Sequence, residues 1–141
     1  MATLSAVKVI ESGITSAPAT CTADGDDFVN TGIEFVRIQN THATATYSIK
    51  LQVNGTTSVK HPQYGTLTKS DIYKTLASPG STGATSAIFG PFKPGSWNTT
   101  NEKVKIFYKT GTGANATAWT ALGTTLAGSH LLKIEVLYLD N

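Results

Sequence analysis

Three aspartates gather in the short segment Asp24–Asp27. Closely spaced carboxylates are the ligands that a hard cation such as Ca²⁺ prefers, and an EF-hand loop adds a glycine at its sixth position and a glutamate at its twelfth. Counted from Asp24, those positions hold Val29 and Phe35. The calcium-loop pattern therefore fails. We interpret the segment as a solvated turn and predict no metal, with an adventitious cation as the open alternative.

The other reactive residue types are scattered along the chain. His42, His61 and His130 lack the short spacing of structural zinc ligands. Cys21 has no local signature of a nucleophile, and neither a Gly-x-Ser-x-Gly elbow nor a phosphate-binding loop is present. Nine acidic residues offer no carboxylate pair that stands out for glycoside hydrolysis. The sequence therefore predicts no enzyme and no cofactor.

The composition favours a β protein. Only 14% of the residues are charged, and 23 threonines and 11 serines supply most of the polar surface. Threonine is β-branched and suits a pleated, half-wet sheet. The formal charge is only +2, with Arg37 as the single arginine, so we expect no nucleic-acid partner. Three lysines, Lys103, Lys105 and Lys109, share one expected strand, which we interpret as a solvated face or a guarded sheet edge.

The length of 141 residues fits one domain, expected to span 1–141. Cys21 is the only cysteine, so no disulfide can form within the chain. We read no secretion signal at the start and no apolar run of about 20 residues that would span a bilayer. We therefore expect synthesis in a reducing cytoplasm and no membrane partner.

The clearest strand signal is Ala45–Val53, where large apolar side chains alternate with polar ones. Asn54-Gly55 follows directly and is typical of a tight hairpin, with residues 56–60 as the returning strand. Ile33–Gln39 is more apolar, which indicates a strand buried on both faces or carrying a bulge. Further strands are expected at 85–92, 103–109 and 131–139.

Two segments depart from this regular pattern. The long excursion 61–83 contains Ser70–Leu76, which we predict as one or two helical turns capped by Ser70. Residues 1–22 form an expected extended N-terminal arm, within which 4–10 is either a strand of the sandwich or a segment that docks on a neighbour. The pattern as a whole predicts an all-β fold with at most one short helix. An antiparallel sandwich of jelly-roll or immunoglobulin-like type is expected, with a small barrel as the second choice.

Aromatic residues in loops are the best candidates for contacts with a partner, because large aromatics anchor protein interfaces. Trp97 lies in a Gly/Pro/Asn-rich corner, and the alternative is that it plugs one end of the sandwich. The predicted contact residues are Leu4, Tyr64, Tyr73, Phe92 and Trp97.

Two stretches of the chain resemble the small β-sandwich proteins encoded among the structural genes of tailed bacteriophages. The segment Gly25–Gly32 matches their Gly-Asp-x-Phe-x-Asn-x-Gly pattern, which leads into a buried strand ending at Asn40. Later come Gly90–Phe92, then Asn98, then the strand Val104–Tyr108. The chain is longer than the shorter members of that group at 61–83 and 110–130.

The resemblance implies a virion component on the outside of the capsid, a head decoration (cement) protein that contacts the major capsid protein and forms a homotrimer. A tail, baseplate or fibre module is the second hypothesis. A carbohydrate-binding sandwich is the third, in which Trp97, Trp119 or Tyr64 would stack on sugar rings.

Overall fold

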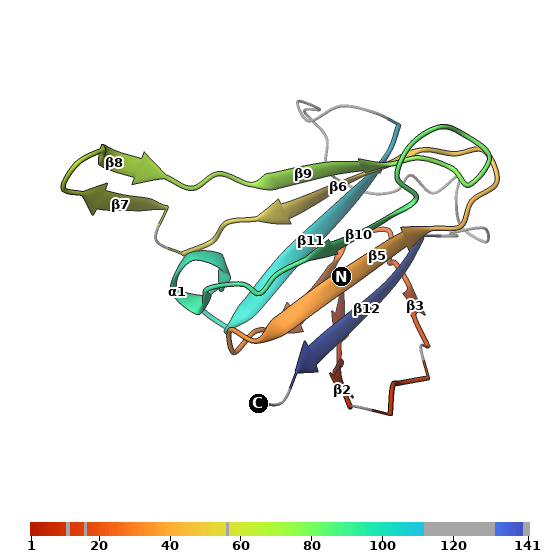
Figure 1. Cartoon of the computed structure of the whole chain (residues 1–141), viewed down its shortest axis with the longest axis horizontal. Helices are drawn as coiled ribbons and strands as arrows, with labels where there is room; N and C mark the ends of the chain where they lie inside the picture. Colours follow the sequence, from red (N-terminus) through yellow and green to blue (C-terminus); the bar gives the residue numbers. More distant parts are fainter. Residues whose placement is uncertain (11, 16, 56, 112–131, 140–141) are drawn as a thin grey trace.

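The computed structural model describes residues 1–10, 12–15, 17–55, 57–111 and 132–139, and it is a sandwich of two open sheets (Figure 1). Sheet A has the order β1-β4-β11-β6-β9, and sheet B has the order β10-β5-β12-β2, with β3 also paired to β12. The strands of sheet A are β1 (Ala2–Leu4), β4 (Asp26–Val29), β11 (Lys103–Thr110), β6 (Tyr47–Gln52) and β9 (Ile72–Leu76). Those of sheet B are β10 (Ser86–Phe89), β5 (Glu34–Asn40), β12 (Leu132–Leu139), β2 (Ala6–Val9) and β3 (Ala19–Thr20).

The all-β sandwich is confirmed, and the barrel is not formed because the described strands leave both sheets open. The sheets are mixed rather than purely antiparallel, since β1 runs parallel to β4 and β2 runs parallel to β12. The short helix α1 (Pro94–Trp97) is the only one among the described residues. None of the described helical structure is long and apolar enough to cross a membrane.

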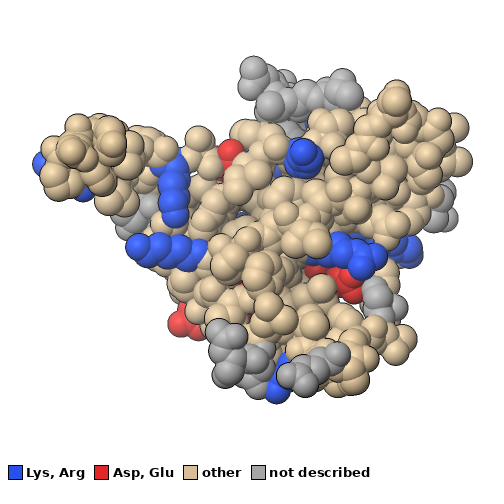
Figure 2. All heavy atoms as spheres, in the orientation of Figure 1, with Lys and Arg blue, Asp and Glu red and all other residues tan. Residues whose placement is uncertain are grey.

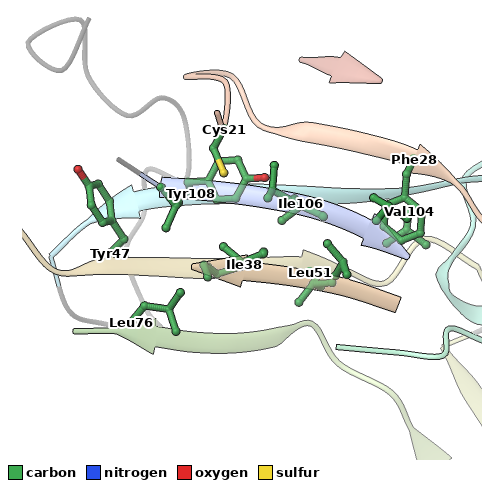
Figure 3. Close-up of a cluster of buried hydrophobic side chains, with 14 of the residues drawn as sticks. Cys21, Phe28, Ile38, Tyr47, Leu51, Leu76, Val104, Ile106 and Tyr108 are labelled. Atoms are coloured by element: carbon green, nitrogen blue, oxygen red, sulfur yellow. The ribbon is translucent and has the colours of Figure 1, made fainter. Parts of the chain in front are cut away.

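Alternation along the strands builds the core. In β11 the side chains of Val104, Ile106 and Tyr108 are fully or almost fully buried, while Lys105 and Phe107 between them are half-buried. The same period of two holds in β6 and β12, as predicted from their sequences. Figure 3 shows these inward side chains meeting between the two sheets. The alternation therefore also decides which side chains remain on the two outer faces.

The strand predicted at Ile33–Gln39, which is β5 in the structure, differs in detail from its prediction. In β5, Val36 and Ile38 are fully buried and Phe35 and Arg37 are half-buried, so the strand alternates like the others. Its register with β12 runs without interruption, and the expected bulge is therefore wrong. Phe35 misleads the sequence pattern because it is a large apolar residue on the outer side of the sheet.

The predicted hairpin at Asn54-Gly55 is wrong. The chain bends there and continues into β7 (Ser58–His61), which pairs with β8 (Gly65–Thr68) rather than with β6. Both backbone N–H groups of Asn54 and Gly55 donate to the carbonyl oxygen of Ser96, at 3.3 and 2.9 Å, so the bend packs against α1. A Cβ atom at Gly55 would clash with the backbone of Gly95, which explains the glycine without a hairpin turn.

The predicted helical turns at Ser70–Leu76 are also wrong, because β9 occupies most of that segment. The strand pairs antiparallel with β6, from Leu51↔Ile72 to Tyr47↔Leu76. The Asp71 carboxylate accepts the backbone N–H of Val53 at 2.9 Å, across the two chain segments, instead of serving a helix N-terminus. Pairing with the open edge of β6 therefore outweighs the weak local helix signal.

The N-terminal segment closes one side of the sandwich within its own chain. β1 pairs with β4 at the edge of sheet A, and after Ser5 the chain crosses to sheet B, where β2 pairs with β12. Leu4 and Ala6 pack against the core from the two sheets. Of the two expectations for residues 4–10, the structure thus shows strand pairing with the body of the same copy.

Candidate interaction surfaces

The aspartates of the Asp24–Asp27 segment point in different directions. Asp26 is fully buried, and its carboxyl oxygens accept the backbone N–H of Thr22 at 3.1 Å, the Thr22 hydroxyl at 2.9 Å and the Tyr108 hydroxyl at 2.8 Å. Asp27 forms an ion pair with Lys103 at 3.1 Å. Asp24 is exposed and lies 3.8 Å from the N-terminal amino group. Within the described residues, no three His, Cys, Asp or Glu side chains group closely enough to hold a metal ion.

Cys21 lies beside this buried carboxyl group, between the two sheets (Figure 3). Burial raises the pKa of the Cys21 thiol far above its usual value. Burial, together with the neighbouring Cys21 and Asp26, raises the pKa of Tyr108 as well. Since a thiolate is the reactive form of cysteine, a thiol in this environment is inert. The cluster is a structural polar network inside the core, and it was not predicted from the sequence.

The described histidines serve local turns. His42 Nδ1 accepts the backbone N–H groups of Thr44 at 3.2 Å and Ala45 at 2.9 Å. His61 Nδ1 accepts the N–H of Gln63 at 3.2 Å. His130 lies outside the described residues. Each described imidazole therefore has a structural partner in its own loop.

The structure buries two of the predicted contact residues. Phe92 and Trp97 are 2% and 8% exposed and pack edge to face with ring centroids 5.5 Å apart. Phe92 also contacts Phe28, at 5.8 Å between centroids. Surface contact through Phe92 and Trp97 is therefore wrong for this structure, and Trp97 plugs one end of the sandwich. The sugar-stacking hypothesis loses Trp97 with it, and Trp119 lies outside the described residues.

The corner that carries Phe92 is held by buried amides. The Asn30 side chain donates to the backbone carbonyl of Phe92 at 3.0 Å and to the side-chain oxygen of Asn98 at 2.6 Å. The Asn98 side chain donates in return to the backbone carbonyl of Asn30 at 2.9 Å. Gly90 has a φ of 116°, and a Cβ there would clash with the backbone of Glu34. These residues belong to the motifs of the sequence resemblance, and their role in this structure is to hold the fold together.

The remaining predicted contact residues lie at the surface or near it. Tyr64 is 71% exposed and Tyr73 is 42% exposed, whereas Leu4 is partly buried against the core. Tyr64 is at the tip of β7–β8, and its ring lies 4.8 Å from that of His61. The structure does not bring these three residues together, since Leu4 and Tyr73 lie on the two opposite edge strands of sheet A and Tyr64 lies at the tip of β7–β8.

One end of the outer face of sheet B is apolar, whereas Lys133, Glu135, Arg37 and Gln39 lie toward the other end. Phe35, Leu137 and Val7 are register partners on three adjacent strands, so their side chains share the outer face. Ile88, on the edge strand β10, is 68% exposed. Near one end of the face, a shallow apolar pocket of about 170 Å³ is lined by Gly32, Ile33, Phe35, Pro91 and Leu139. Figure 2 shows this side of the molecule as largely uncharged, with blue and red atoms meeting at one place over its right half.

One ion pair crosses this apolar face. The Arg37 guanidinium contacts the Glu135 carboxylate at 3.1 Å, and these two residues are also register partners. Ile88 is the register partner of Arg37 on the other side. Each of the two charges therefore has an opposite charge as its partner beside the apolar surface.

The outer face of sheet A has the opposite character. Lys103, Lys105 and Lys109 alternate with the buried side chains of β11 and therefore lie on the outer side. On the adjacent strand β6, Lys50 is the register partner of Phe107, and its ammonium lies 4.8 Å from the centre of the Phe107 ring. These lysines were interpreted as a solvated face or a guarded sheet edge, and the edge alternative is wrong because β11 lies between β4 and β6. A fourth lysine, from the neighbouring strand, joins them, which the sequence alone did not reveal.

The third surface is the ribbon, defined as β7, β8 and the turn between them, which projects from the body of the sandwich (Figure 1). Val59 and Leu67 are register partners on one of its faces, and they are 54% and 49% exposed. Two isolated strands are marginally stable in water and normally need a further layer to cover their apolar side. Nothing in the described part of the same copy provides that layer.

Comparison with protein-family profiles, with curated proteins and with solved structures finds no match to this chain. The surfaces that this chain offers to a partner are an apolar sheet face, a lysine-bearing sheet face and an uncovered ribbon.

Proposed function

We propose that this chain is a structural virion protein that decorates and stabilises the head of a tailed bacteriophage. In this proposal it is made in the host cytoplasm, lies on the capsid exterior, contacts the major capsid protein and forms a homotrimer. The observation that carries the proposal is the exposed apolar surface of sheet B and of the ribbon. Large exposed apolar patches mark sites of protein association.

The chemistry of the described residues supports association rather than catalysis. The polar groups with the most perturbed pKa values, Cys21 and Tyr108, are enclosed between the sheets, where a substrate cannot reach them. The shallow pocket at Gly32 and Leu139 is apolar and carries no titratable side chain. Such a hollow suits an apolar side chain of a partner, because interface cores are packed from large apolar residues.

The presence of two different apolar surfaces supports the trimer. A two-fold dimer uses one self-complementary patch, whereas a ring of three copies needs two different patches on each copy that contact each other head to tail. The ribbon and the outer face of sheet B are two such patches. In the proposed trimer, Val59, Tyr64 and Leu67 of one copy pack on the sheet B face of the next.

The proposal is tested by measuring the mass of the purified protein in solution and then its binding to bare phage heads. A trimer that saturates the heads at a fixed number of copies is the expected result. A monomer that ignores heads would overturn the proposal. Binding to tails instead of heads would support the tail or fibre module, and a shift in tryptophan fluorescence on adding glycans would support the sugar-binding sandwich.

A further inference from the structure

We propose that the outer face of sheet A is the surface that docks on the capsid shell, and that the shell presents carboxylate side chains to it. This inference rests on the proposed function and adds to it which face meets the shell and what chemistry that face recognises. The partner is thus an acidic protein surface rather than a second copy of this chain.

The positions of the lysines carry the argument. Alternate residues of β11 project from the same side of the sheet about 6–7 Å apart, so Lys103, Lys105 and Lys109 form a row along the strand. Lys50 lies on the adjacent strand, opposite Phe107. The four ammonium groups therefore lie on one flat face built by two strands at the centre of a sheet, where neighbouring strands hold the backbone in place.

Acidic residues balance only part of the charge on this face. Asp71, two positions before the outward Tyr73, interacts with the Tyr73 side chain and is one such acid. Asp27 is the one acid that β4 places on it, and its carboxylate is paired with Lys103 at 3.1 Å. No acidic side chain of the described residues forms an ion pair with Lys105 or Lys109. A face with surplus positive charge attracts a surface of opposite sign and repels its own copies.

The kind of positive charge favours carboxylates of a protein over phosphates of a nucleic acid. Phosphate recognition relies heavily on the bidentate guanidinium of arginine, and the single arginine, Arg37, lies on the other sheet in an ion pair with Glu135. Reading a duplex also requires an element that enters a groove, whereas this face is the flat side of a sheet. Phe107 and the exposed Tyr73 ring, both register partners of Lys50, add apolar contact area of the sort that protein interfaces use.

The test compares two double variants that change the net charge equally. Lys105→Glu/Lys109→Glu reverses two charges on the proposed face, and Lys8→Glu/Lys93→Glu reverses two exposed lysines that lie off sheet A. Binding to bare, DNA-free heads is measured over a range of salt concentrations, and the mass of each variant is measured in parallel. We expect the first variant to keep its assembly state but to bind heads about a hundredfold more weakly, because like charges then face each other across the contact.

The control variant should bind heads within about twofold of the unmodified protein, since charges outside a contact act only at long range. Lys105→Arg/Lys109→Arg should restore binding, because it keeps the charges. If Lys105→Glu/Lys109→Glu binds as tightly as the unmodified protein, or if salt leaves the affinity unchanged, the inference is wrong while the decoration role stands.

Failure of the unmodified protein to bind heads at all would overturn the decoration role itself. Binding of double-stranded DNA that depends on Lys105 and Lys109, without binding of DNA-free heads, would show that the face recognises phosphates instead. These outcomes therefore distinguish a wrong docking face from a wrong proposed function.

Discussion

The two outer faces of this sandwich are built by the same geometry and carry different chemistry. On β11 the outward positions hold Lys103, Lys105, Phe107 and Lys109, whereas on β12 they hold Lys133, Glu135, Leu137 and Leu139. Both strands lie inside their sheets, and both bury a nearly continuous set of apolar residues on the inner side. The inner residues therefore specify the fold, and the outer residues are left to specify the partners.

In the proposed assembly, this difference would let one small domain hold two kinds of contact at once. Apolar association on sheet B is strong but does not choose its partner by charge, while lysines on sheet A steer and orient a charged partner. A protein that had two apolar faces would polymerise through either one. The separation of the two chemistries onto opposite sheets instead gives each face a distinct role.

The largest effect on stability should come from a substitution in the core between the two sheets. Asp26→Ala leaves the Tyr108 hydroxyl and the Thr22 backbone N–H without their acceptor. We expect a loss of about 3 kcal/mol in the free energy of unfolding, measured by chemical denaturation, because unpartnered buried polar groups are costly. Asp24→Ala, at an exposed position of the same turn, should change stability by less than about 0.5 kcal/mol. Equal effects of the two variants would contradict the buried network.

The next largest effect should be on self-association. Charges placed on sheet B or on the ribbon should abolish it without changing the outer face of sheet A. Ile88→Asp/Leu139→Asp places charges on the apolar face, and Val59→Asp/Leu67→Asp does so on the ribbon. Each variant alone should be monomeric, with about 2 kcal/mol or more lost from association. Mixing the two should give dimers in light-scattering measurements, because one intact ribbon still meets one intact face. Monomers in the mixture would rule out the head-to-tail contact.

A smaller loss of stability should appear on acidification, through the Glu34 carboxylate near the pocket of sheet B. The Glu34 carboxylate accepts the Thr31 hydroxyl at 2.8 Å and the N–H groups of Thr31, Gly32 and Ile33 at 2.7, 3.1 and 3.2 Å. Burial alone raises the pKa of Glu34, but these hydrogen bonds outweigh it and hold the pKa below its ordinary value of 4.5. A pKa that is lower in the folded state stabilises the protein at neutral pH, and the benefit is lost as pH falls from about 4.5 through the folded value.

Glu34→Gln should therefore lower stability by about 1 kcal/mol at pH 7 and by much less at pH 3. Thermal melts of the two proteins across this range give the measurement. A constant difference at every pH would show that the Glu34 charge contributes nothing to stability.

The smallest effect on folding should come from the ribbon. Replacing 58–68 with a short Gly/Ser turn removes strands that pair only with each other. We expect the melt of a dilute, monomeric sample to change by less than about 0.5 kcal/mol, while trimer formation is lost. Unfolding of the shortened protein would show that the ribbon belongs to the core and is not a separate contact element.

Much of the fold follows from period-two alternation. The strands β6, β11 and β12 could be predicted because a large apolar residue recurs at every second position through most of each strand. Asn54-Gly55 was misread because turn chemistry says where the chain bends, not which strand it pairs with next. Ser70–Leu76 was misread because an edge strand gains its stability from a neighbour that the local sequence does not contain.

The surfaces were harder to predict than the strands. Asp26 looks like one more residue of a polar turn until the fold brings Tyr108, 82 positions along the chain, within 2.8 Å. The exposed apolar face depends on the register of Phe35, Leu137 and Val7, which come from three separate strands. Trp97 appeared to be a loop aromatic because the Phe92 ring on which it packs is joined to Phe28 of the core only by tertiary packing.

The place of β12 in sheet B also has a consequence for when the protein can fold. This strand is the last to be synthesised among those described, yet it pairs with β5 on one side and with β2 and β3 on the other. Until it leaves the ribosome, sheet B lacks the strand that joins its halves, and the long-range pairing of β12 with β5, β2 and β3 cannot begin. Sheet B is therefore expected to close only after β12 has been made, so a chain that ended before this strand would lack the apolar surface to which β12 contributes.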